Sequence, residues 1–315
     1  IATPDLTRNK TAEFKPSSHP SHTIDTKSLG AREWEDLLVA KKSEAGSSGV
    51  IFALLKKGVV VLKSGNTLAE EIFGAWIAQQ MGVSVPLMRL CRFDNGERQA
   101  VSKALRRTAS TATKISISRI LQRSNLGVME YVNGTPLVDL NNTPNKECLK
   151  QIGGILVLDV VLNNFDRMPF IWDNQGNADN ILFSKGRMVA LDNRVVCPTS
   201  KQARERHLAK VHSLCKGYQT NKVQTTEWAD IVEFWETRTA MGKLDQKSLQ
   251  TIAQGFEEAA KLACSNLTDD KLKEMHTKLE KLSEGAASQF WLTQVHGVDI
   301  TFISAILKAL KEYFS

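Results

Sequence analysis

The sequence predicts an α+β protein of two lobes, with an antiparallel sheet and one main helix in the N-terminal lobe and mostly α-helices in the C-terminal lobe. Short β-branched runs bounded by turn residues, Val50–Leu55 and Val59–Lys63, predict the sheet. Apolar residues at helical spacing dominate the chain after Thr225 and predict the helical lobe. We therefore expect an N-terminal arm over residues 1–30, an N-lobe over 31–132 and a C-lobe over 133–315.

The composition is that of a soluble globular protein of 315 residues, with a net charge of +7. This charge suits nucleotide phosphates, an acidic protein surface or anionic lipid, and does not choose among them. The five cysteines are scattered without a Cys-x-x-Cys spacing, which disfavours a zinc site or a disulfide scaffold and favours a reducing compartment. No apolar run approaches the roughly 20 residues that cross a bilayer, so we expect no stable membrane association.

The N-lobe begins after an arm that is rich in Ser, Thr and Pro. Trp34–Lys41 is predicted to be the first strand. A turn of small residues then leads into the two β-branched strands and contains Gly46, Ser47, Ser48 and Gly49. Because small residues let backbone N–H groups approach a phosphate closely, this turn is a candidate phosphate loop, although a plain hairpin turn has the same composition.

A helix follows Lys63, which ends the second β-branched strand. Asn66 or Thr67 has the chemistry of its N-cap, and Gly82 is its predicted stop.

Two carboxylates in the first turn of this helix, Glu70 and Glu71, are candidate partners of Lys63. We favour Glu71, because the small residues Gly74 and Ala75 follow it on the same face and leave room for the strands. The alternative is that both carboxylates only complement the positive end of the helix.

Two further strands, Val83–Phe93 and Leu126–Val132, complete the predicted sheet, and Asn133–Pro136 breaks the second. Between them, residues 98–123 carry many cations and no acidic residue. This basic segment is either a solvated face or a docking surface for an acidic protein or membrane. It has no aromatic residue for base stacking, and we expect no nucleic-acid partner.

The stretch from Leu158 to Asn193 carries three polar anchors, each beside an apolar run. Asp166 follows the buried helix predicted over Ile155–Leu162. Asn180 opens the first strand of a predicted hairpin, and Asp192 follows the second.

The helices predicted after Thr225 direct several aromatic side chains toward a core. These are Trp228, Phe234, Trp235, Phe256 and Phe314. The isolated histidines are expected to be structural or exposed, and these are His207, His212, His276 and His296.

These features follow one another in the order of a protein-kinase-like catalytic centre. The order is a lysine, a helix carboxylate, a strand with a breaker, and then Asp, Asn and Asp. In that layout Lys63 holds the nucleotide α- and β-phosphates, and Asp166 accepts the proton of the attacking hydroxyl. Asn180 and Asp192 offer the hard oxygen ligands that Mg²⁺ prefers. Arg167 could steady the transferring phosphate or pair with a nearby carboxylate.

The strand before the breaker would be the hinge of such a two-lobed fold. Backbone groups of Glu130, Tyr131 and Val132 would then meet the adenine edge, with Met129 beside the pocket.

The details differ from those of common protein kinases and resemble one atypical family. Phe165-Asp166-Arg167 replaces His-Arg-Asp, thirteen residues separate Asp166 from Asn180, and the last motif is Leu-Asp-Asn rather than Asp-Phe-Gly. The Asp-Arg and Asp-Asn pairs resemble type II phosphatidylinositol 4-kinases. The text LNNFDRMPFIWDNQGNADNILF, with GVVVLKSG and AEEIFGAWIAQQMGVSVP, most resembles the catalytic domain of the actin-fragmin kinases, over about residues 30–315.

This resemblance implies a protein-kinase-like two-lobed fold and a Ser/Thr protein kinase that uses ATP and Mg²⁺ or Mn²⁺. Its substrate would be a threonine of actin in a complex with fragmin. The resemblance places the nucleotide lysine at Lys63, its partner at Glu71 or Glu70, and the base at Asp166, with metal ligands at Asn180 and Asp192. It also implies a monomeric catalytic domain in the cytoplasm at the actin cytoskeleton.

Two other functions remain open from the sequence. A phosphoinositide kinase could use the basic residues after Asp192 to bind a headgroup, namely Arg194, Lys201, Arg204 and Arg206. A non-catalytic binding module of kinase shape is the second alternative, although all the expected polar anchors are present.

Overall fold

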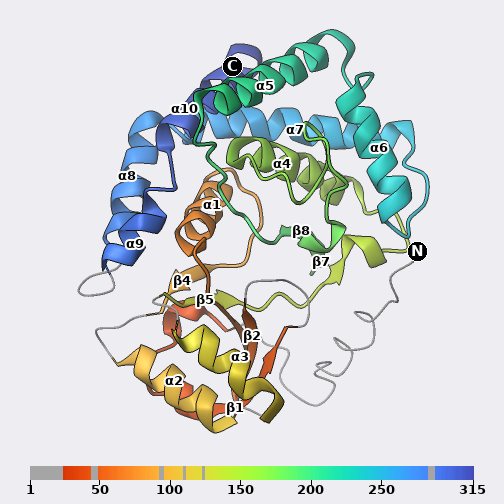
Figure 1. Cartoon of the computed structure of the whole chain (residues 1–315). Coiled ribbons are helices and arrows are strands. Elements are labelled where there is room, and N and C mark those ends of the chain that lie inside the picture. Colours follow the sequence, from red (N-terminus) through yellow and green to blue (C-terminus); the bar gives the residue numbers. More distant parts are fainter. Residues whose placement is uncertain (1–23, 44–48, 92–95, 109–110, 123–124, 283–287) are drawn as a thin grey trace. The chain divides into compact units, whose positions relative to one another are not determined.

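The structure, a computed structural model, describes residues 24–43, 49–91, 96–108, 111–122, 125–282 and 288–315 (Figure 1). The chain forms two compact units, one of Ile1–Leu68 with Leu87–Asn133 and one of Ala69–Pro86 with Gly134–Ser315. Gly46, Ser47 and Ser48 of the predicted phosphate loop lie outside the described residues, as does most of the predicted arm.

The first unit is built on a five-stranded antiparallel sheet in the order β1-β2-β3-β5-β4. Its strands are β1 (Leu37–Lys42), β2 (Val50–Leu55), β3 (Gly58–Lys63), β4 (Met88–Leu90) and β5 (Gly127–Glu130). It also contains the 3₁₀ helices η2 (Thr26–Ser28) and η3 (Glu33–Asp36) and the helices α2 (Glu97–Thr108) and α3 (Thr111–Gln122). The predicted antiparallel N-terminal sheet is confirmed.

Two predicted strands are shorter than expected. The first begins only at Leu37, because residues 33–36 form a 3₁₀ turn in which the Glu33 carboxylate accepts the Gly30 N–H at 2.8 Å. The strand predicted from Val83 pairs only over Met88–Leu90. Pro86, just before it, has no N–H to contribute to a sheet.

The basic segment forms α2 and α3, which pack against the sheet through apolar residues at helical spacing. Val101, Leu105, Ile117 and Ile120 are buried in the same core as β2, β3 and β5. The segment therefore has a structural role, while several of its cations, Lys103, Arg106, Lys114 and Arg119, remain exposed.

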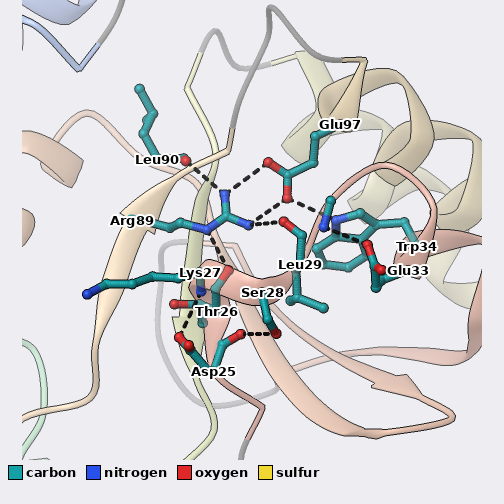
Figure 2. Close-up of polar contacts among 11 residues, drawn as sticks. Asp25, Thr26, Lys27, Ser28, Leu29, Glu33, Trp34, Arg89, Leu90 and Glu97 are labelled. Atoms are coloured by element: carbon teal, nitrogen blue, oxygen red, sulfur yellow. Dashed lines mark hydrogen bonds and ion pairs between the residues drawn. The ribbon is translucent and has the colours of Figure 1, made fainter.

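A buried ion pair joins the N-terminal turn, β4 and α2 (Figure 2). Arg89 donates to both carboxylate oxygens of Glu97, at 2.7 and 2.9 Å, and Glu97 has no exposed surface. Arg89 also donates to the carbonyl oxygens of Thr26 (2.7 Å) and Leu29 (3.0 Å), and the Trp34 indole donates to Glu97 at 3.0 Å. Bidentate, charge-assisted bonds of this kind fix geometry as well as contributing energy.

The second unit contains a small sheet and most of the helices (Figure 1). Its sheet has the order β6-β7-β8, from strands β6 (Thr135–Pro136), β7 (Ile181–Ser184) and β8 (Arg187–Ala190). Helix α1 (Leu68–Gln80) belongs to this unit from Ala69 onward. The other helices are η4 (Leu137–Asp139), α4 (Lys146–Leu162), η5 (Ala178–Asn180), α5 (Lys201–Asn221), α6 (Thr226–Arg238), α7 (Gln246–Asn266), α8 (Asp269–Glu280), α9 (Ser288–Val295) and α10 (Ile300–Phe314).

Helices α4 and α7 lie side by side and cross with their backbones in contact (Figure 1). A Cβ on Gly153 of α4 would lie 2.1 Å from the Ile252 carbonyl oxygen, and a Cβ on Gly255 of α7 would lie 2.1 Å from that of Lys150. Neither position can accept a side chain without moving a helix. The five aromatic residues predicted to face the core of this lobe are all buried.

One segment, Gln289–Phe314, has the length and apolar composition of a membrane-spanning helix, which the sequence expectation did not include. In the structure it holds two helices, α9 and α10, and half of its most apolar window is buried within the protein. The C-terminal majority of the chain is helical, as predicted.

The variant Glu97→Gln should lower the free energy of unfolding by about 3 kcal/mol, because it leaves the Arg89 guanidinium without its buried counter-charge. Urea denaturation followed by circular dichroism measures this change. The matched control is Asp36→Asn, which removes an exposed ion pair to Lys56 and should change stability little. A similar loss in both variants would contradict the structural role of the buried pair.

Stability should also fall in acid because of His207, whose imidazole is buried and stacks against Trp172. Burial lowers its pKa from 6.5 to about 4, so between these values the unfolded chain binds a proton that the folded chain excludes. Stability is therefore lost as pH falls from 6.5 toward 4. Between pH 7 and pH 5, the free energy of unfolding of His207→Gln should fall by about 2 kcal/mol less than that of the parent protein in denaturant titrations. An equal fall in both proteins would refute the role of His207 in the pH dependence.

Candidate active site

The candidate site begins where α4 ends. Asn163 adopts the left-handed conformation (φ 52°), and its N–H bonds to the carbonyl oxygens at the helix terminus. Its side chain donates to the Val196 carbonyl oxygen at 2.9 Å and accepts the Trp172 indole N–H at 3.0 Å. Asparagine tolerates this conformation and can bond in both directions, so it turns the chain sharply into the loop that carries Asp166.

Asp166 and Asn180 lie together although thirteen residues separate them. The Asn180 amide donates from Nδ2 to the Asp166 carboxylate at 2.9 Å. Asn180 ends the 3₁₀ turn η5, which Asn177 caps by accepting the Asp179 N–H. The Asp166 side chain is exposed. The predicted base is therefore positioned by a side chain and accessible to an incoming hydroxyl.

Asp192 follows β8 and also adopts the left-handed conformation, with φ of 49°. Its carbonyl oxygen accepts the Asn164 side chain at 3.0 Å, and the preceding residue, Leu191, donates its N–H to the Asn180 carbonyl oxygen at 2.9 Å. The bond from Asn164 joins Asp192 to the Asp166 loop. The bond from Leu191 joins the same segment to the Asn180 turn, so the structure links all three predicted anchors of this unit.

Arg167 is completely buried and holds these loops from inside. Its guanidinium donates to the Asp159 carboxylate on α4, to the Leu191 carbonyl oxygen at 2.6 Å and to the Asn193 side chain at 2.8 Å. Of the two predicted roles, pairing with a carboxylate is the one observed. The catalytic role for Arg167 is corrected accordingly, because a guanidinium without exposed surface cannot reach a transferring phosphate.

The Asp159 carboxylate is as buried as its partner. Burial raises its pKa to about 7, against the opposite effect of the Arg167 charge. Its second oxygen has no hydrogen-bond partner among the described residues. Burying both charges therefore costs desolvation free energy, and the pair contributes mainly by fixing the positions of the segments that Arg167 bonds.

Helix α1 is fastened to the segment after Asp192. A Cβ on Gly74 would lie 1.9 Å from the Asn193 carbonyl oxygen, so only glycine allows this approach. The Arg194 guanidinium donates to the Glu70 carboxylate, and burial raises the pKa of Glu70 while Arg194 opposes that shift. Glu70 is thus engaged inside the second unit.

The predicted nucleotide-binding residues belong to the first unit. Lys63 ends β3, is buried, and pairs across the sheet with Val50 and Gly127. Gly49, at the end of the predicted phosphate loop, has the left-handed φ of 59°. Lys63 and Glu71 stand in different units, and their pairing stays a prediction.

The hinge prediction is corrected at one atom. The Glu130 N–H donates to the Leu87 carbonyl oxygen at 2.9 Å as part of the sheet, and is not available to an adenine. The Glu130 carboxylate likewise accepts the Leu87 N–H at 3.0 Å. Met129 lies in the ladder opposite Val61, and Tyr131 contacts the Phe52 ring at 6.0 Å between centroids.

The donor set fits a magnesium ion bound jointly with nucleotide phosphates. Because the Asn180 Nδ2 is directed to Asp166, its Oδ1 remains to act as a ligand. The Asp192 carboxylate would supply the second hard oxygen ligand. Within the described residues, no three His, Cys, Asp or Glu side chains are grouped to hold a metal ion. Mg²⁺ is usually coordinated by only one or two protein carboxylates, together with substrate phosphates and waters.

The sequence interpretation missed the polar residues that position the anchors, Asp159, Asn164 and Asn193. Asp159 carried a signal, because it is the one charged residue within the apolar run 155–162. A charge at a buried helical position requires a partner, and Arg167 follows eight residues later, in the loop after the helix.

Removing one member of the buried pair should cost far more stability than removing both. Arg167→Met should lower the free energy of unfolding by about 3 kcal/mol or more, because Asp159 loses its counter-charge. The double variant Asp159→Leu with Arg167→Met should recover at least half of that loss. Guanidinium denaturation of the two variants provides the test, and a double variant no more stable than the single one would contradict the pairing.

The amino-acid sequence matches the family described as "Actin-fragmin kinase, catalytic" over residues 16–286. A Dictyostelium discoideum protein named as an actin-fragmin kinase is 24% identical over 311 aligned residues, which cover 90% of this chain and 74% of that protein. A second protein of that organism and name is 27% identical over 135 residues, covering 39% of this chain and 31% of the relative.

Among solved structures, the Helicobacter pylori proinflammatory kinase CtkA aligns with a TM-score of 0.39 and 11% identity, covering 84% of this chain and 94% of CtkA. A protein described as an aminoglycoside phosphotransferase from Ralstonia eutropha aligns with a TM-score of 0.32 and 10% identity, covering 92% and 99%. These likenesses are distant, and the assignment rests on the sequence match. That match covers most of the chain and includes every predicted anchor, and the chain belongs to the actin-fragmin kinase catalytic-domain family.

Proposed function

We propose that this chain is an ATP-dependent Ser/Thr protein kinase that phosphorylates a threonine of actin presented in an actin–fragmin complex, at the actin cytoskeleton of the cytoplasm. Family membership supports a kinase. The observation that carries the assignment of the site is the bond between Asn180 and Asp166, because it joins the candidate base to the candidate metal ligand. Each is then close to where a phosphoryl group would be transferred.

In this mechanism Asp166 takes the proton of the threonine hydroxyl while its oxygen forms a bond to the γ-phosphorus and the bond to the ADP oxygen breaks. A positioned base of this kind contributes roughly 10²–10⁴-fold. Asn180 and Asp192 would hold Mg²⁺ or Mn²⁺, which neutralises phosphate charge when bound. Arg167 and Asp159 keep the two segments in register, since Arg167 bonds on both sides of Asp192.

Lys63 is the proposed ligand of the α- and β-phosphates, oriented by a carboxylate of α1. Because Glu70 is engaged by Arg194, Glu71 is the better candidate for this partner. It is buried, and a buried carboxylate requires a positive or hydrogen-bonding partner.

Two of the four basic residues after Asp192 are engaged within the protein, which weakens the case for a phosphoinositide headgroup site. Arg194 pairs with Glu70, and Arg204 pairs with Asp299 and donates to the Pro198 carbonyl oxygen. Cations engaged in this way offer less charge to a lipid phosphate.

The variant Asp166→Asn should reduce kcat by roughly 10²–10⁴-fold with little change in ATP binding, because an amide cannot accept the proton. Transfer of radiolabelled phosphate from ATP to an actin–fragmin complex measures the rate. Asp270→Asn, at an exposed position of α8, is the matched control and should keep full activity.

Phosphoinositide vesicles replace the protein substrate in a parallel reaction. Faster labelling of lipid than of actin would reject the protein-kinase proposal. Undiminished labelling by Asp166→Asn would reject the assignment of the base.

A further inference from the structure

A groove of about 660 Å³ lies within the second unit, and none of the residues assigned to phosphoryl transfer lines it. One wall is residues 169–175, from the insertion between Asp166 and Asn180. The other is one face of α6, with side chains of α5 at the end. Nothing in the proposed reaction uses this groove.

The insertion wall is tied to the loop that carries the candidate base. The Asn174 side chain donates to the Phe165 carbonyl oxygen, and the Asn177 N–H donates to the Arg167 carbonyl oxygen at 2.9 Å. At its inner side Phe170 is buried, with its ring 5.2 Å from that of Trp228 on α6. The groove is therefore fixed relative to Asp166 on the same unit.

Four carboxylates line the groove, from Asp173 on the insertion and Glu227, Asp230 and Glu233 on α6. Their mutual repulsion adds to burial, the larger effect, in raising the pKa of Asp230. None of the four side chains forms an ion pair or hydrogen bond with another of the described residues.

The two cations of the groove are already engaged in its walls. The Lys210 ammonium donates to the Ile171 carbonyl oxygen at 3.0 Å, and the Arg238 guanidinium donates to the Gln175 side chain. Both cations keep their charge, because their partners are neutral oxygens, and four carboxylates against two cations leave the lining with a net negative charge.

The arrangement of these charges suits a chain better than a single ion. No three of the acidic side chains are grouped closely enough to hold a metal ion within the part of the chain that is described. Glu227, Asp230 and Glu233 recur every third residue along the helix, which spaces them by about 4.5 Å at 1.5 Å per residue. The row therefore spans about 9 Å, and an extended peptide places side chains of one face about 6.6 Å apart, so two of its cationic residues can meet the row.

We propose that this groove docks a basic, extended segment of the protein substrate and holds it on the unit that carries Asp166. The docking role rests on the proposed kinase function, whereas binding of a basic peptide does not. Complementary charge of this kind would give specificity and faster association more than high affinity.

Fluorescence anisotropy of a labelled peptide of alternating Lys and Ala, with an alternating Glu and Ala peptide as comparison, tests the binding on the nucleotide-free protein. The parent protein should prefer the Lys peptide, and added salt should weaken the preference. The double variant Asp230→Asn with Glu233→Gln should bind the Lys peptide roughly fivefold to tenfold more weakly. Glu236→Gln, which removes a charge from α6 outside the groove, should bind as the parent does.

Charge reversal with Asp230→Lys and Glu233→Lys should transfer the preference to the Glu peptide. Equal affinity of the parent for both peptides, or equal weakening in Glu236→Gln, would overturn the proposal.

Phosphoryl transfer to the actin–fragmin complex gives a separate readout. The neutralised variant should raise KM for the protein substrate several-fold and leave KM for ATP unchanged, because the groove holds no residue assigned to the nucleotide. Failure of the Asp166→Asn test would remove the kinase proposal and leave the peptide-binding result standing. Unchanged KM for the complex would remove the docking role instead.

Discussion

The second unit depends on one buried ion pair, Asp159 with Arg167. The pair sits where α4, the loop after it and the segment after β8 come together: Arg167 belongs to the loop and bonds to the other two. Desolvation makes such a pair expensive, and apolar residues of similar size would hold a core as well. What they could not do is fix the direction of two polar loops, because only directional hydrogen bonds specify where a carbonyl and an amide must lie.

Local patterns in the sequence were enough to predict most elements, including the hairpin of β7 and β8, the helix ending at Leu162 and the helical C-terminal majority. They also predicted chemical roles for Asp166, Asn180 and Asp192, since each interrupts or borders an apolar run. Arg167 shows where such reasoning fails. Its charge and its place beside Asp166 suggested a catalytic contact, and only the three-dimensional burial shows that it faces inward. Asp159 left a signal as a charge within an apolar run, but no spacing rule predicts that Asn193, 26 residues after Arg167, is a partner as well.

The insertion between Asp166 and Asn180 serves the interior and the surface at once. Met168 and Phe170 are buried in the aromatic core, and Phe170 adopts a positive φ of 30° that a phenylalanine accepts only when its surroundings determine it. Residues 169–175, Phe170 among them, also line the acidic groove. The insertion thus contributes side chains to the hydrophobic core and also presents one polar face, so it is not merely a surface loop. Lengthening or shortening it would disturb packing before it changed recognition.

The glycine crossing of α4 and α7 has a further consequence for how activity and unfolding are related. Backbones in direct contact have no side-chain layer that could yield between them, so α4 moves only if α7 moves with it. Since α4 leads straight into the Asp166 loop, the proposed base follows a helix whose backbone is fixed against that of its neighbour. On heating, catalysis should therefore not fade ahead of the helices. It should disappear in the same cooperative transition that melts them.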